Sequence, residues 1–165
     1  MKNFFLIICI LFSISNVSQV LAQSSSLSPV AIEEEDPLLK EAVEKAKGSL
    51  SLLRELYQTY PDDTTVKVPF ITSSGQLEYL WGQLRSMDDK DMEVFLLTPP
   101  VTHTGEVERL QKYPVSELQD WAVYLPDGKI RGGFSMKVNY IRARETGQEI
   151  PKDALEMEKL YVDHK

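Results

Sequence analysis

The chain has 165 residues, with 18 Lys and Arg against 25 Asp and Glu, two His and one Cys. This length suits one domain with a core of its own and is too short for two, while the apolar content of 42% argues against a disordered chain. The acidic balance repels phosphate backbones and therefore argues against a general nucleic-acid binder.

The first 22 residues have the pattern of an export signal. Lys2 provides a positive start, an apolar run follows from Phe4 to Phe12, and Val20-Leu21-Ala22 precedes an expected cleavage before Gln23. The apolar run is too short for a permanent membrane span. We therefore expect a bacterial protein that is exported to the periplasm or secreted, with no span after cleavage. The single cysteine, Cys9, leaves with the signal, and the net charge becomes −8 because Lys2 is lost with no acid.

The next segments are predicted from composition and periodicity. Residues 23–35 are Ser-rich and then acidic, which indicates a flexible linker. Asp36-Pro37 is a typical helix start, with a capping carboxylate and a proline in the first turn. A single helix is predicted from there to about Thr59, where Pro61 follows. Its apolar stripe has spacings of three and four: Leu39, Val43, Ala46, Leu50, Leu53 and Tyr57.

From Thr64 the apolar period changes to two, which predicts strands. We expect strands at 64–70, 76–87, 92–97 and 107–113, the first of them near a sheet edge because it contains Pro69. A hairpin is predicted from 121–125 and 130–141 around Pro126-Asp127-Gly128, with alternation in its second strand. Its apolar side is expected in the core together with Val66 and Phe70, and consists of Phe134, Met136, Val138 and Tyr140.

The predicted fold class is α+β. One long N-terminal helix crosses a twisted, mainly antiparallel sheet of five to six strands, and a short C-terminal helix covers about 152–161. The expected organisation is a signal at 1–22, a linker at 23–35, a single domain at 36–145 and a tail with the short helix at 146–165.

Four motifs occur in series along the strand-rich half. They are VKVPF at 66–70, ExxW at 78–81, LQDW at 118–121 and DGKIRGGFSMKV at 127–138. This series resembles the bacterial YegJ-like domain, a family of unknown function, and the resemblance extends over about 36–142 with a weaker match at Pro151-Lys152. Where that family usually has a His and an Asn, this chain has Tyr79 and Thr98. The resemblance implies an exported α+β domain and supplies no activity.

The usual catalytic and metal-binding motifs are missing from the sequence. The predicted mature chain has no cysteine and only His103 and His164, too few of the ligands that zinc prefers. It contains no calcium loop, no G-x-S-x-G and no S-x-x-K motif. We therefore expect neither a metal site nor a cofactor, and no catalytic residue is assigned.

Five residues form the candidate binding group: Glu78, Trp81, Asp120, Trp121 and Arg131. As a recognition patch, the two indoles would offer apolar area and the charges would set orientation. In the structural alternative, the tryptophans belong to the core and Asp120 accepts backbone N–H groups at the entry to the hairpin. Gly132-Gly133 would then permit a bulge or the close passage of another backbone.

The sequence favours a binding protein over an enzyme. The leading hypothesis is a non-enzymatic, exported binding or interaction domain, inhibitor-like or immunity-like, whose partner is a basic protein or envelope ligand because the surface is acidic. The alternative is a cell-envelope hydrolase that uses Glu78 and Asp120 as acid and base, with His103 as a further group. That alternative requires these side chains to converge on one substrate atom.

Overall fold

The computed structural model describes residues 36–162 and confirms an α+β fold, with four helices and a seven-stranded, mostly antiparallel sheet. The predicted signal at 1–22 and linker at 23–35 lie outside these residues. No helix within 36–162 combines the length and apolar character needed to cross a membrane. In chain order the elements are α1 (Pro37–Gly48), α2 (Leu50–Thr59), η1 (Pro61–Asp63), β1 (Thr64–Ile71), β2 (Leu77–Met87), β3 (Asp91–Leu96), β4 (Leu110–Pro114), η2 (Val115–Glu117), β5 (Asp120–Tyr124), β6 (Ile130–Gly132), α3 (Phe134–Glu145), α4 (Lys152–Glu158) and β7 (Tyr161–Val162).

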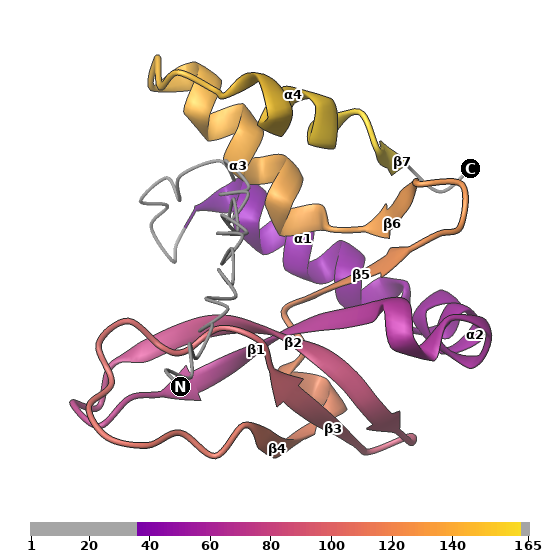
Figure 1. Ribbon diagram of the computed structural model, residues 1–165, viewed down its shortest axis with the longest axis vertical. Coiled ribbons are helices and arrows are strands. Elements are labelled where there is room, and N and C mark those ends of the chain that lie inside the picture. Colours follow the sequence, from indigo (N-terminus) through magenta and orange to yellow (C-terminus); the bar gives the residue numbers. More distant parts are fainter. Residues whose placement is uncertain (1–35, 163–165) are drawn as a thin grey trace, which may run out of the picture.

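The sheet has the strand order β4-β3-β2-β1-β5-β6-β7, and only the β6–β7 pair is parallel. Figure 1 shows two halves: β1–β4 lie at one end of the molecule, and α1, α3 and α4 lie with β5–β7 at the other. β1 connects them, because residues 64–67 pair with β5 while residues 65–71 pair with β2. The N-terminal helices pack on the sheet as predicted, with Ala46 and Leu53 in its core.

The alternation predicted for β1 is confirmed by its burial. Val66, Val68 and Phe70 are buried, while the residues between them are half-buried. They pack with side chains from β2, β3, β5 and α2 in one continuous cluster. This cluster accounts for most of the core, as expected for a domain whose described residues contain no disulfide.

Prolines mark the open stretches of two strands. The Thr72 N–H donates to Gln76 O, toward β2. Because backbone N–H directions alternate along a strand, the Pro69 nitrogen, three residues earlier, points away from β2 and lies beyond the end of β5. In the same way Val115 N donates to Lys90 O, so the nitrogen of Pro114 points away from β3. β1 is therefore not the edge strand that Pro69 predicts. Each proline instead removes a donor that would recruit a further strand.

The predicted helix over 37–59 is divided into two. α1 ends at Gly48 and α2 begins at Leu50, with Ser49 between them at φ −107° and ψ 19°. The Ser49 hydroxyl donates to Lys45 O over 2.7 Å and accepts from the Trp121 indole N–H over 3.1 Å. The break therefore lies where the indole docks, and it turns α2 onto the core.

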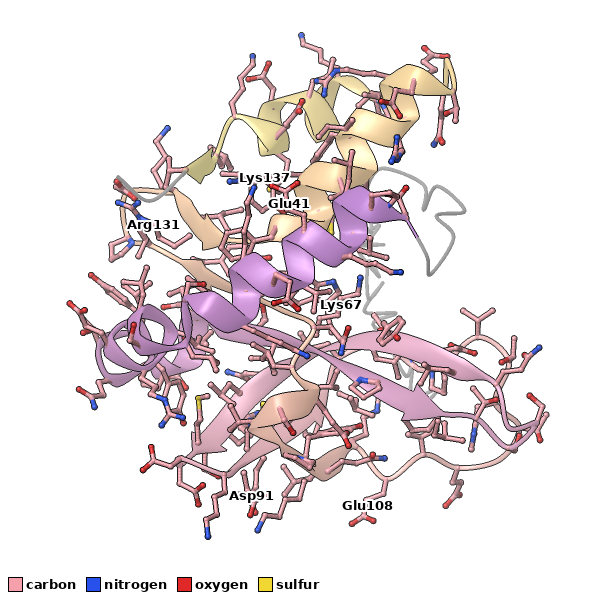
Figure 2. All side chains as sticks on the ribbon, turned by 180° about the vertical axis from the view of Figure 1, so that it is seen from behind. Glu41, Lys67, Asp91, Glu108, Arg131 and Lys137 are labelled. Atoms are coloured by element: carbon pink, nitrogen blue, oxygen red, sulfur yellow. The ribbon has the colours of Figure 1, made fainter. Side chains whose placement is uncertain are left out.

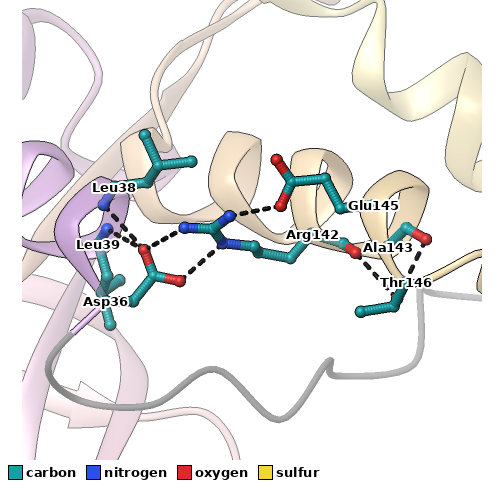
Figure 3. A network of polar contacts seen from close by, with 7 residues as sticks. All are labelled: Asp36, Leu38, Leu39, Arg142, Ala143, Glu145 and Thr146. Carbon is teal, nitrogen blue, oxygen red and sulfur yellow. Dashed lines mark hydrogen bonds and ion pairs between the residues drawn. The ribbon is translucent and has the colours of Figure 1, made fainter.

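Asp36 caps α1 as predicted and also holds α3. Its carboxylate accepts the backbone N–H of Leu38 over 2.8 Å, and both of its oxygens bind the Arg142 guanidinium over 2.7 and 2.8 Å. Arg142 also binds Glu145, so one arginine connects two acidic groups (Figure 3). The pKa of Asp36 is lowered to about 2, from an ordinary 3.8, and the hydrogen bonds from Arg142 are the main cause.

The Asp36–Arg142 pair predicts a defined loss of stability in acid. The pKa of Asp36 is lower in the folded than in the unfolded state. Its contribution to the free energy of unfolding is therefore fully present above about pH 4 and is lost as the pH falls to about 2. We expect wild type and Asp36→Asn to differ in unfolding free energy at neutral pH and to converge near pH 2, in urea titrations across this range. Asp127→Asn, at an exposed turn, is the control. A difference that persists unchanged at about pH 2 would contradict the assignment.

The predicted second hairpin strand over 130–141 is wrong beyond Gly132. Strand β6 ends there, because Gly132 and Gly133 have φ values of 81° and 65°, and the chain continues as helix α3. Its first free N–H groups, those of Phe134 and Ser135, are bound by the Asp120 carboxylate. Of the four alternating apolar residues, Val138 and Tyr140 are buried and Phe134 and Met136 are half-buried. Ser135 and Ala143, outside that alternating set, are buried as well.

The C-terminal segment also departs from its prediction. α4 begins at Lys152 as expected but ends at Glu158, and residues 161–162 form β7 beside β6. This parallel strand raises the sheet from the expected five to six strands to seven. Ala154 is the buried residue of α4, and it packs with Tyr140 and Ala143 of α3 in a second, smaller cluster.

Candidate functional site

The five residues of the candidate binding group do not form one patch. Lys67 of β1 is paired with Trp81 on one side and with Asp120 on the other, so these three lie in one row on one face of the sheet. Glu78 is paired with Phe70 and lies on the opposite face. Arg131 is half-buried on β6, paired with Val123, and Figure 2 shows it far from Lys67.

Asp120 lies at the start of β5 with no exposed surface. One carboxylate oxygen accepts the N–H of Trp121 over 2.8 Å and that of Phe134 over 3.1 Å. The other accepts the N–H of Ser135 over 2.7 Å and its hydroxyl over 2.6 Å. Burial raises the pKa of this carboxyl, while the bonds from Ser135 act in the opposite direction.

These contacts give Asp120 the role of a helix cap supplied from a distant strand. The position before α3 is Gly133, which has no side chain to bind the free N–H groups. The Asp120 carboxylate does so instead, at the positive end of the helix dipole. The geometry therefore matches the structural alternative for Asp120 rather than a surface recognition residue.

Trp121 also belongs to the core. It has no exposed surface, and its indole N–H donates to Ala46 O over 3.2 Å and to the Ser49 hydroxyl. Its ring meets Phe134 edge to face, with centroids 5.8 Å apart. Trp81, by contrast, is half-buried and lies on the face away from the core.

Glu78 attaches the loop between β3 and β4 to the β1–β2 hairpin. Its carboxylate accepts the N–H groups of Val101 and Thr102, each over 2.7 Å, and the Thr102 hydroxyl over 2.5 Å. The Thr102 hydroxyl is the largest cause that lowers the pKa of Glu78. In the same loop, His103 Nδ1 accepts the Ser73 N–H over 3.0 Å.

The acid–base pair of the hydrolase hypothesis is not assembled by this fold. Asp120 lies on the Lys67 face of the sheet and Glu78 on the Phe70 face, and residues 67 and 70 point to opposite sides of β1. Both carboxylates also bind several backbone N–H groups. They do not converge on one substrate atom.

The sequence did not single out Lys67 and Ser135, which the fold brings together. The Lys67 ammonium donates to the Ser135 hydroxyl over 3.4 Å, and that hydroxyl donates in turn to Asp120. Lys67 also lies near the Tyr79 ring, 6.0 Å from its centroid. The one local signal is a lysine between two buried valines of a strand. Nothing local shows that residues of α1 come to lie beside this lysine.

Apolar side chains gather on the face of β1–β4 that points away from the core, which we call the outer face. By strand alternation and register its apolar members are Pro69, Ile71, Leu77, Tyr79, Trp81, Phe95, Leu97 and Leu110. Leu97 joins this row because its N–H donates to Trp81 O over 3.1 Å. Exposure is large for Ile71 (65%), Leu77 (42%), Leu97 (47%) and Leu110 (49%), and the three aromatic rings are half-buried.

Comparisons with protein-family models, with curated proteins and with solved structures find no match. The membership in the YegJ-like family that the motifs indicate therefore stays a prediction. Among residues 36–162 there is also no group of three or more His, Cys, Asp or Glu side chains placed to hold a metal ion.

Proposed function

We propose that this chain is a non-enzymatic binding domain that recognises a protein partner through its outer face. The observation that carries this proposal is the row of apolar side chains across β1–β4, four of them more than 40% exposed. Patches of this kind on a soluble domain are typical of interaction sites. The half-buried rings of Tyr79, Trp81 and Phe95 supply the rigid aromatic anchors that carry much of the energy in interfaces.

The proposed contact uses the face of the sheet rather than its edge. Pro69 and Pro114 occupy outward positions of the two open strand stretches, so a partner strand would find donors missing at both. Side-chain packing on the outer face has no such restriction. This distinguishes the proposal from strand addition, in which main-chain hydrogen bonds supply the affinity.

The charge of the chain supports one kind of partner. A net charge of −7, or −8 without the predicted signal, favours a basic protein and increases the rate of encounter with it. An exported acidic domain that binds a basic protein corresponds to an inhibitor-like or immunity-like domain that acts in the bacterial envelope or outside the cell.

The test compares a variant of the outer face with a matched control. Ile71→Thr/Leu77→Thr removes the most exposed cross-strand apolar pair but keeps the charge and the preference for strand. Tyr124→Thr changes a strand residue that is 46% exposed in the other half of the molecule. Residues 23–165 of each form are immobilised, and envelope proteins retained at low salt are identified, purified and titrated back.

We expect a partner that saturates the wild type and the Tyr124→Thr control, and binds the double variant at least tenfold more weakly. Its affinity should decrease as salt is added, because part of the attraction is electrostatic. Thermal unfolding of all three forms verifies that they are folded. The proposal is refuted if no protein binds saturably, or if the double variant binds as tightly as the wild type.

A further inference from the structure

A cavity lies where α1 approaches β1 and the start of α3. Ile71 and Leu77 of the outer face are not among its lining residues. Its volume is about 330 Å³, at the lower end of the range typical of small-ligand sites. Figure 2 shows Lys67 just beside α1, at the junction of the two halves of the molecule. The lining residues come from five segments of the chain: Leu39, Lys40, Val43, Glu44, Lys67, Tyr79, Gln119 and Ser135.

Two lysines line this cavity: Lys40 is exposed, whereas Lys67 is half-buried in the wall. Among residues 36–162 the Lys67 amine makes one hydrogen bond, the 3.4 Å contact with the Ser135 hydroxyl. Asp120 is the nearest source of negative charge, but its oxygens are taken by the donors of Trp121, Phe134 and Ser135. Within the described part of the chain, two of the three Lys67 N–H donors therefore remain for a ligand.

Burial makes this charge costly without an anion beside it. Desolvation lowers the pKa of Lys67, and the attraction of Asp120 acts in the opposite direction. A ligand that brings a negative oxygen to the amine would offset the desolvation.

The remaining wall selects the size and kind of anion. Leu39 and Val43 are half-buried and present an apolar side, and the Tyr79 ring adds another. The free N–H groups of α3 are occupied by Asp120, so the helix start offers no phosphate site. The lining has no arginine to grip a dianion with a planar pair of donors. The lining side chains carry a net charge of +1, from Lys40 and Lys67 against Glu44, and together with the apolar side this suits a singly charged carboxylate.

We propose that this cavity binds a small monocarboxylate with an apolar tail, its carboxylate on Lys67 and its tail against Leu39 and Val43. Leu39 and Val43 both belong to α1, so the tail lies along that helix. The cavity shares Tyr79 with the outer face, but the proposed carboxylate contact at Lys67 does not require the partner proposed there.

The test is calorimetric titration of the mature chain, residues 23–165, with hexanoate as the probe. Lys67→Met removes the ammonium but keeps the length of the side chain. The control is Lys112→Met on β4, outside the cavity. It removes an exposed amine that binds Asp91 of β3. Hexylamine and inorganic phosphate serve as probes of the wrong charge and the wrong anion.

We expect saturable binding of hexanoate to wild type and Lys112→Met, at least tenfold weaker binding to Lys67→Met, and little binding of the other two probes. Equal binding of hexylamine, equal binding to Lys67→Met, or no saturable binding of hexanoate at millimolar concentration overturns the proposal. If Lys67→Met melts well below the wild type, Lys67→Gln replaces it and is held to the same tenfold loss.

Discussion

Asp120→Asn is expected to lower the stability of the domain by about 2–3 kcal/mol, because one acceptor oxygen is replaced by an amide N–H₂ group. The buried carboxylate accepts three backbone N–H groups and the Ser135 hydroxyl. If the amide nitrogen takes the place of the first oxygen, the N–H groups of Trp121 and Phe134 both face a donor. If it takes the place of the second, the Ser135 N–H faces a donor, while the Ser135 hydroxyl can turn and accept. The loss corresponds to a decrease in melting temperature on the order of 10 °C, measured by calorimetry or circular dichroism.

The control for Asp120→Asn is Asp127→Asn in the turn between β5 and β6. That carboxylate accepts only the N–H of Lys129, over 3.0 Å at an exposed position, and asparagine is common in such turns. The melting temperature of Asp127→Asn should stay within about 2 °C of that of the wild type. If Asp120→Asn melted at or above the wild-type temperature, the carboxylate would not be needed for folding and would become the leading candidate for a site residue.

Gly132→Ala is expected to cost on the order of 4 kcal/mol, the larger of the two effects. A Cβ at this position would lie 2.1 Å from Trp121 O and 2.7 Å from its ring. That carbonyl cannot move away easily, because it accepts the N–H of Gly133 over 2.7 Å. The φ of 81° adds backbone strain for any residue with a side chain.

Gly147→Ala separates the two causes of that loss. Gly147 also has a positive φ, of 70°, but a Cβ there would meet nothing within 4 Å. We expect it to cost only about 1 kcal/mol, the strain alone. Denaturant unfolding of both variants beside the wild type measures the difference. Similar losses for the two glycines would mean that contact with Trp121 contributes little.

The junction of Asp120, Trp121 and Gly132 connects the sheet to three helices. Asp120 holds the start of α3, and the Trp121 indole holds the break between α1 and α2. Gly132 lets the chain pass close to the Trp121 backbone. Three helices are therefore positioned by two consecutive residues of β5. Substitutions here should affect folding before they affect any binding surface.

Local sequence was sufficient where the stabilising partners are near in the chain. Asp36 caps α1 through N–H groups two and three residues away, so the Asp-Pro pair predicts the helix start correctly. Alternation along β1 predicts its buried side, because Val66, Val68 and Phe70 pack on a single core. The predominantly antiparallel sheet and the α+β class follow from such local patterns.

Where the deciding partner is distant, the sequence by itself was not enough. Phe134, Met136, Val138 and Tyr140 alternate like a strand, but Asp120 caps the segment from 14 residues earlier and makes it a helix. The cavity depends in the same way on tertiary contacts, because α1 must be folded back over Lys67 and Ser135 before any wall exists. Periodicity and caps act within a few residues, whereas a shared site requires segments joined by the packing of the whole core.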